Sequence, residues 1–189
     1  MMPRGPMVIL IGMRGSGKTT IGRGVAGKLS RTFIDLDMAV LDTFEQPTVR
    51  RVWSEFGESV WREAEANAFA RILSQQSQMD DDVVLALGGG APVISGVRDA
   101  IIRERAAGRA LACYLRCSPE VLIQRLARSE SDRPALTPLD AEQELRTVLA
   151  SRTPIYEALA DIKIDVTDDD VERHAAELAR EIHRWTFQA

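Results

Sequence analysis

The 189-residue sequence has little of several features that mark particular classes of protein. It has two cysteines, Cys113 and Cys117, which lie four positions apart without a nearby histidine, a poor pattern for a metal site. Its apolar runs are only strand-sized, so we expect no membrane-spanning helix. A net charge of −4 gives no basic field for DNA or RNA. We therefore expect a cytoplasmic protein that binds neither nucleic acid nor a membrane, with both cysteines as buried thiols.

Short apolar runs alternate with helical patterns along the chain, which is typical of βαβ units and a parallel sheet. We expect five strands, at 7–11, 32–35, 83–87, 110–115 and 161–166. We expect helices near 18–29, 48–55, 58–76, 96–106, 119–127 and 140–149, and a last helix that begins after 167–170. The length suits one domain. The predicted fold is thus a three-layer α/β domain over 1–189, with helices on both faces of a five-stranded parallel sheet.

The segment 12–19, GMRGSGKT, follows the first apolar run and precedes a helical pattern. It fits GxxxxGK[ST], the phosphate-binding loop. The glycines let backbone N–H groups form an anion-binding nest, to which the following helix adds its dipole. Lys18 can reach the β- and γ-phosphates, and the Thr19 hydroxyl can bind Mg²⁺. The predicted triphosphate site comprises Gly15, Ser16, Gly17, Lys18, Thr19 and Thr20.

A phosphate loop alone does not distinguish kinases from motors, GTPases or transport ATPases. Motors and GTPases need more chain, and the NKxD motif of GTPases is absent. The polar segment 129–138 holds two prolines and separates two predicted helices, so it is a natural candidate for a mobile lid. An ordinary surface loop is the alternative. A short chain with such a loop favours a small-molecule or nucleotide kinase.

Two aspartates, Asp35 and Asp37, end the second predicted strand. By strand alternation they share one side at the carboxyl edge of the sheet, where ligands bind in open α/β folds. One can hold Mg²⁺ through water, while the other orients or deprotonates an attacking hydroxyl. The alternative is that Asp37 only N-caps a following helix.

One arginine, Arg62, lies on an otherwise apolar helical face, so its guanidinium must find an anion or leave that face. A bound ligand and an internal salt bridge with Glu58 or Glu65 both satisfy this requirement.

Three glycines and a second arginine complete the candidate site. The segment 88–90, GGG, follows the central strand and lets a ligand approach the backbone closely, although a tight turn without a ligand is the alternative. Arg152 precedes Pro154, which we expect to end the helix and aim Arg152 toward the cleft. A cation at the helix C-terminus is the alternative for Arg152.

Six segments in this order resemble the shikimate kinase family, small members of the nucleoside-monophosphate-kinase-like group: GMRGSGKT, FIDLD, FGESVWREAE, LALGGGAP, DRPAL and RTPIYE. They span 12–157. The phosphate loop occurs in many families, whereas the succession of the other segments is far more specific. The resemblance implies ATP-dependent phosphorylation of the 3-hydroxyl of shikimate, a step toward chorismate and the aromatic amino acids. It also implies a lid at about 128–139 and a substrate-binding helical segment at about 37–66.

The resemblance assigns residues position by position. It places shikimate against Asp37, Arg62, Gly88, Gly89, Gly90 and Arg152, with the two arginines on its carboxylate. It places Mg²⁺ on Thr19 and Asp35. It implies that Lys18 and the lid residue Arg133 contact the transferring phosphate and so act with Asp37 in catalysis. It places Arg125 against adenine, with a one-residue uncertainty in the alignment, and 167–170 near the same base. At 133–136 the chain reads RPAL where the family has RPLL, which puts the lid packing in doubt but not the arginine.

Two other functions compete with this interpretation. A gluconate kinase would also bind a carboxylate and hydroxyls, but the ordered set of Asp35, Asp37, Arg62, 88–90 and Arg152 argues against it. A nucleotide-binding module without catalysis would not need a lid arginine and a base. We further expect in-line transfer without a phosphoenzyme, and a monomer, because no long exposed apolar helix is left over.

Overall fold

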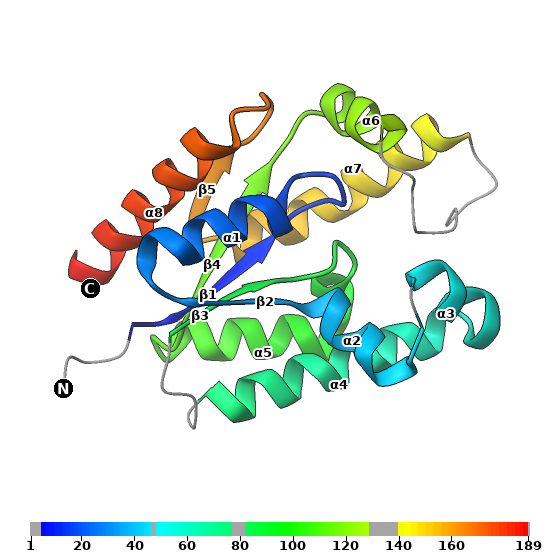
Figure 1. The fold of residues 1–189 in the computed structure, drawn as a ribbon, viewed down its shortest axis with the longest axis horizontal. Coiled ribbons are helices and arrows are strands. Elements are labelled where there is room, and N and C mark those ends of the chain that lie inside the picture. Colours follow the sequence, from blue (N-terminus) through cyan, green and yellow to red (C-terminus); the bar gives the residue numbers. More distant parts are fainter. Residues whose placement is uncertain (1–4, 47, 77–81, 129–139, 189) are drawn as a thin grey trace.

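Five parallel strands form one sheet in the order β2-β3-β1-β4-β5 (Figure 1). The computed structural model describes residues 5–188, apart from residue 47 and the segments 77–81 and 129–139. The strands are β1 (Met7–Ile11), β2 (Thr32–Asp35), β3 (Val83–Ala86), β4 (Ala110–Arg116) and β5 (Ile162–Asp165). The predicted five-stranded parallel sheet is confirmed, with ends that differ from the predicted ones by at most one residue.

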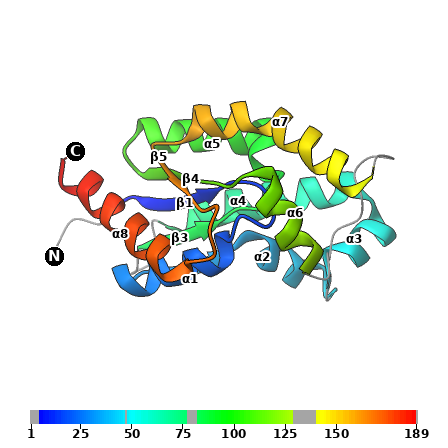
Figure 2. The same cartoon turned by 90° about the horizontal axis from the view of Figure 1, so that it is seen from above.

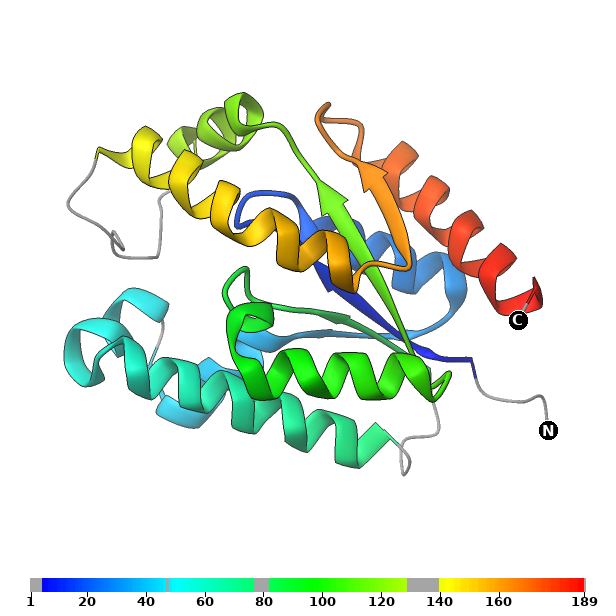
Figure 3. The same cartoon turned by 180° about the vertical axis from the view of Figure 1, so that it is seen from behind.

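Helices cover both faces of the sheet, which gives the predicted three layers (Figures 1, 2 and 3). One face carries α1 and α8, and the other carries α4, α5 and the C-terminal part of α7. The helices are α1 (Lys18–Leu29), α2 (Leu36–Phe44), α3 (Val49–Phe56), α4 (Glu58–Gln76), α5 (Ser95–Ala106), α6 (Pro119–Arg128), α7 (Ala141–Leu159) and α8 (Val171–Gln188), with a 3₁₀ turn, η1, at Ala91–Val93.

The central strand β1 shows why the sheet is covered on both sides. Successive side chains alternate between the faces. Met7, Ile9 and Ile11 join the core under α4 and α5, while Val8 and Leu10 join the core under α1 and α8. All five side chains are fully buried, as expected for a parallel strand between two helical layers. The carboxyl end of β1 leads directly into the phosphate loop.

One helix was missing from the predicted set. Helix α2 begins directly after β2, and its N-cap is Asp35, whose carboxylate accepts a hydrogen bond from the backbone N–H of Asp37 at 3.0 Å. The alternative in which Asp37 caps this helix is therefore wrong, because Asp37 lies within the first turn. Both aspartates remain at the carboxyl edge of the sheet.

Helix α7 is longer than predicted. Its expected end at 149 is wrong, because the helix continues through Pro154 to Leu159. The proline lacks the N–H that would bind the carbonyl of Ala150, which is a local cost. The last turns nevertheless bury Tyr156 and Leu159 in the core beneath the sheet, and this packing stabilises the helix beyond the proline.

Several expectations concern segments outside the described residues. The predicted lid at 128–139 lies there except for Arg128, which ends α6, and Arg133 lies there too. Within the part of the chain that the structure describes, no helix combines the length and apolar character needed to cross a bilayer. Cys113 and Cys117 are both buried free thiols, as predicted.

Candidate active site

A cleft of about 480 Å³ lies at the carboxyl edge of the sheet. It is lined by the phosphate loop, by the start of α2, by the glycines after β3, and by side chains from α6 and the start of α8. Ten of the predicted site residues line it: Gly15, Gly17, Lys18, Thr19, Thr20, Asp35, Asp37, Gly88, Gly89 and Arg125. These ten residues therefore lie around one cleft, whereas Ser16, Arg62, Gly90 and Arg152 are not among its lining residues and Arg133 lies outside the described residues.

The phosphate loop has the backbone geometry that the motif predicts. Gly15 and Gly17 have φ values of 81° and 88°, which L side chains rarely adopt. The Lys18 side chain folds over the loop, and its Nζ donates to the carbonyls of Gly12 at 2.9 Å and Met13 at 2.8 Å. The Ser16 hydroxyl is buried and has no hydrogen-bond partner among the described residues. A buried hydroxyl in this loop is suited to an anionic ligand.

Thr19 and Asp35 form the most direct link between the loop and β2. The Thr19 hydroxyl donates to Oδ2 of Asp35 at 2.6 Å. A hydroxyl and a carboxylate are oxygen ligands of the kind that Mg²⁺ prefers, and this ion usually takes only one or two protein ligands besides phosphates and water. Within the described residues there is no cluster of three or more His, Cys, Asp and Glu that would form an all-protein metal cage. The pair thus fits a magnesium ion shared with a nucleotide.

Arg62 on α4 forms ion pairs with both Glu58 and Glu65, the two carboxylates considered above as its internal partners. Its Nη1 donates to Glu65 at 2.6 Å and its Nη2 to Glu58 at 3.0 Å. Glu65 is fully buried, and the guanidinium also lies over the ring of Trp53 at 5.5 Å. Burial alone would lower the pKa of Arg62, but the two carboxylates raise it overall. Arg62 is therefore a permanent cation held in a fixed position.

Arg62 and Arg152 approach the same glycine segment from different helices. Nη1 of Arg152, on α7, donates to the carbonyl of Gly89 at 3.1 Å, and the hydroxyl of Tyr156 donates to the same oxygen at 2.5 Å. A β-carbon at Gly90 would lie 2.2 Å from Nη1 of Arg62. Arg152 lies in the interior of α7, so its interpretation as a C-terminal helix cation is wrong.

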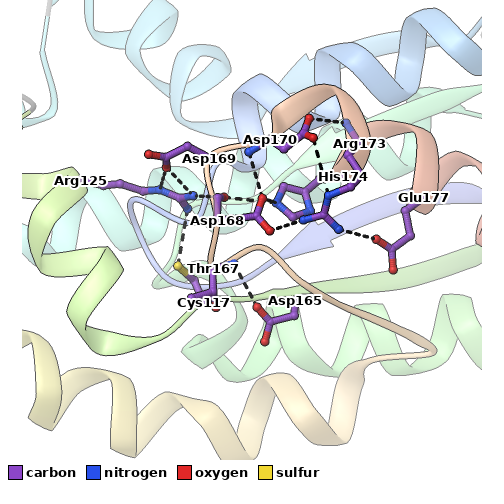
Figure 4. A network of polar contacts seen from close by, with 10 residues as sticks. All are labelled: Cys117, Arg125, Asp165, Thr167, Asp168, Asp169, Asp170, Arg173, His174 and Glu177. Atoms are coloured by element: carbon purple, nitrogen blue, oxygen red, sulfur yellow. Dashed lines mark hydrogen bonds and ion pairs between the residues drawn. The ribbon is translucent and has the colours of Figure 1, made fainter.

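Arg125 from α6 and the segment that precedes α8 together line one side of the cleft (Figure 4). Nη2 of Arg125 donates to the backbone carbonyl of Asp168 at 2.6 Å and to the carboxylate of Asp169 at 3.0 Å. Only the family resemblance placed both Arg125 and 167–170 near adenine, and in the structure the two contact each other.

Two features of the site were missed from the sequence. His174 is 1% exposed and lines the cleft, although the sequence suggested only that it is no metal-ligand partner of His183. Arg14 of the phosphate loop forms an ion pair at 3.3 Å with the buried Glu144 of α7. No local pattern could reveal this pair, because its members are 130 positions apart.

Comparisons with known proteins identify the family of this chain. A family model described as shikimate kinase matches residues 14–183. The shikimate kinase of Stenotrophomonas maltophilia strain K279a is 38% identical over 160 residues, which cover 85% of this chain and 82% of that protein. That of Bordetella pertussis is 38% identical over 164 residues, covering 87% and 72%. This chain belongs to the shikimate kinase family. It is accordingly a kinase that uses ATP. Family membership also supports the shikimate kinase interpretation over a gluconate kinase and over a nucleotide-binding module without catalysis.

Solved structures place this shikimate kinase family member in the same group. A shikimate kinase from Acinetobacter baumannii, in complex with shikimate, is 29% identical with a TM-score of 0.83, covering 95% of this chain and 94% of that one. A shikimate kinase from Bacteroides thetaiotaomicron is 28% identical with a TM-score of 0.77, covering 94% and 98%. A gluconokinase from Sinorhizobium meliloti 1021, at 24% identity and a TM-score of 0.63, shares the fold alone.

Proposed function

We propose that this protein transfers the γ-phosphoryl group of ATP to the 3-hydroxyl of shikimate. The observation that carries the proposal is the meeting of Arg62 and Arg152 at Gly89 and Gly90, beside a cleft that also holds the phosphate loop and Asp37. Two guanidinium groups near an aspartate complement a small molecule with a carboxylate at one end and hydroxyls at the other.

On the acceptor side, Arg62 and Arg152 bind the carboxylate of shikimate. Gly88 and Gly89, which line the cleft, let the ring approach their backbone closely, and the segment at about 37–66 supplies the rest of the substrate pocket. Asp37 contacts the hydroxyls, since it lines the cleft in the first turn of α2. It orients the 3-hydroxyl toward the phosphate loop and is placed to accept its proton.

On the donor side, the triphosphate lies on Gly15, Ser16, Gly17 and Thr20, and its base lies toward Arg125. Lys18 and Arg133, the latter from the lid proposed at about 128–139, stabilise the charge on the transferring phosphoryl oxygens. Thr19 and Asp35 would hold Mg²⁺. When bound, this ion neutralises the charge of the phosphate oxygens. We expect in-line transfer, so a chiral γ-phosphate would be inverted, and net retention would contradict a mechanism without a phosphoenzyme.

The proposal is tested by following ADP release with shikimate and with gluconate side by side. We expect rapid release with shikimate and only background release with gluconate. ADP release with gluconate alone would show that the protein is a sugar-acid kinase. No release with either compound, while ATP still binds, would indicate a nucleotide-binding module without catalytic activity.

We also propose that the protein acts as a cytoplasmic monomer, since its large exposed apolar side chains are dispersed over several elements rather than gathered on one helix. Light scattering at micromolar concentration tests the oligomeric state.

A further inference from the structure

We propose that His174 is a positioning residue for the nucleotide, acting through Asp168 on the guanidinium of Arg125. This inference rests on the proposed function, in which the nucleotide base lies on the Arg125 side of the cleft. It concerns a residue that does not itself contact the transferred phosphate.

His174 lies in the first turn of α8, beneath the wall of the cleft. Its Nε2 lies 3.0 Å from Oδ1 of Asp168 and 3.2 Å from the backbone carbonyl of the same residue. Its Nδ1 is buried and has no hydrogen-bond partner among the described residues. A proton on Nε2 therefore serves both contacts to Asp168, whereas a proton on Nδ1 would be buried without an acceptor among the described residues.

Asp168 connects α8 to the cleft wall (Figure 4). Its carboxylate accepts a hydrogen bond from the backbone N–H of Asp170 at 3.0 Å and pairs with Arg173. The N–H of Asp170, followed by the charge of Arg173, lowers the pKa of Asp168, and the hydrogen bond from His174 acts in the same direction, so the group is a carboxylate at neutral pH. Its backbone carbonyl accepts the 2.6 Å hydrogen bond from Arg125. The side chain is thus held by α8, while the main chain holds Arg125.

Arg125 is fixed by acceptors from two further residues. Its Nε and Nη2 donate to Asp169 at 3.1 and 3.0 Å, and its Nη1 lies 3.5 Å from the sulfur of Cys117. A guanidinium is planar and stacks on aromatic rings, so the acceptors around it determine which face it offers to a base.

The buried histidine is better suited to this task than its neighbour Arg173. The Arg173 side chain is about half exposed and also pairs with Asp170 and Glu177, so its contacts can rearrange. The His174 ring is enclosed and touches both the carboxylate and the carbonyl of Asp168. Without it the carbonyl would lose its contact to the buried ring on α8. Arg125 would then depend mainly on the carboxylate of Asp169, which is 70% exposed and can rearrange.

The test uses the full chain, with ATP and inorganic tripolyphosphate as probes in calorimetric titrations without shikimate. His174→Phe keeps an aromatic ring but removes the donor, and we expect it to weaken ATP binding about tenfold, a typical loss for a stacking contact. Tripolyphosphate should bind unchanged, because it has no base. His174→Gln retains a donor and should recover most of the affinity. His183→Phe, the same change on the exposed face of α8, is the matched control.

Arg125→Met separates positioning from a structural effect. In that background His174→Phe should cause no further loss of ATP affinity, because the group through which it acts is already gone. Two results would overturn the proposal. One is an equal loss of affinity for ATP and for tripolyphosphate in His174→Phe. The other is that His174→Phe still weakens ATP binding about tenfold in the Arg125→Met background. If His174→Phe does not fold, Asp168→Ala removes the carboxylate contact of His174 at an exposed side chain but keeps the backbone carbonyl, so it should weaken ATP binding by less than about tenfold and leave tripolyphosphate binding unchanged. Since these titrations need no acceptor, they remain decisive even if shikimate proves not to be the substrate.

Discussion

Gly90 and Arg62 fit together with no room for a methyl group between them, since a β-carbon on Gly90 would lie 2.2 Å from the Arg62 guanidinium. The neighbouring carbonyl of Gly89 accepts a hydrogen bond from Arg152. The glycines after β3 therefore set the positions of two cations that belong to helices about 90 residues apart in the sequence. Bare backbone at Gly90 is required by the position of Arg62, whether or not a ligand is bound.

Replacing Gly90 by alanine should displace Arg62. The displaced guanidinium also pairs with the buried Glu65, so we expect a loss of about 1–3 kcal/mol in the free energy of unfolding. We also expect a fall of about ten- to a hundredfold in kcat/KM for shikimate. The affinity for ATP should not change. Gly96→Ala is the matched control, because a β-carbon there meets no atom within 4 Å. Unchanged kinetics in Gly90→Ala would show that Arg62 does not bind the substrate from its observed position.

Asp35 has two tasks that substitution can separate. It N-caps α2 and accepts the hydrogen bond from Thr19. Asp35→Asn keeps a good cap but removes the charge, so we expect nearly native stability and a roughly tenfold higher Mg²⁺ concentration for half-maximal activity. Asp35→Ala should in addition lose about 1 kcal/mol of unfolding free energy. Magnesium titrations together with urea denaturation check both effects, and an unchanged Mg²⁺ requirement in both variants would remove Asp35 from the metal site.

The sheet was predictable because each strand is a short apolar run between helical patterns. In β1 every side chain is buried, and the run itself carries that information. Helix α2 was missed because its nine residues follow β2 without a break, and its cap, Asp35, had been assigned to the metal. The length of α7 was missed because a local rule about Pro154 was outweighed by the burial of Tyr156 and Leu159, which is a tertiary effect.

The site was predictable where single segments carry the chemistry, as in the phosphate loop and at Asp35 and Asp37. The contacts between segments could not be predicted from local patterns. Nothing near Arg62 indicates that its guanidinium packs against Gly90, and nothing near Arg14 indicates that it pairs with Glu144. These contacts depend on how the helices are placed on the sheet.

Asp37→Asn tests the proposed role of this aspartate in orienting or deprotonating the acceptor. The variant retains size and polarity but lacks a base, so kcat should fall by about 10²–10⁴-fold, while the dissociation constant of ATP stays within about twofold. Single-turnover kinetics combined with ATP titration separates the two quantities. Comparable losses in turnover and in nucleotide affinity would mean that Asp37 is structural.

The two cysteines should be unreactive in the folded protein. Burial raises the pKa of Cys113, and it also raises the pKa of Cys117, where the nearby Arg125 opposes the shift. The reactive thiolate is therefore scarce at pH 8. We expect no reaction with a thiol reagent under native conditions and two reactive thiols in denaturant. The thiols of the unfolded chain lose their protons at a lower pH than the buried thiols of the folded chain. Ionisation therefore favours the unfolded state, and the free energy of unfolding should fall as the pH rises above about 8.5. Rapid native labelling would contradict the burial of both side chains.

The convergence of Arg62 and Arg152 on one small carboxylate is tested most directly by a crystal structure of the protein with shikimate and a non-hydrolysable ATP analogue. We predict that both guanidinium groups lie about 2.7–2.9 Å from the carboxylate oxygens, with the 3-hydroxyl between Asp37 and the γ-phosphate. A complex in which either arginine points away from the carboxylate, with its hydrogen bonds only to protein groups, would contradict the account.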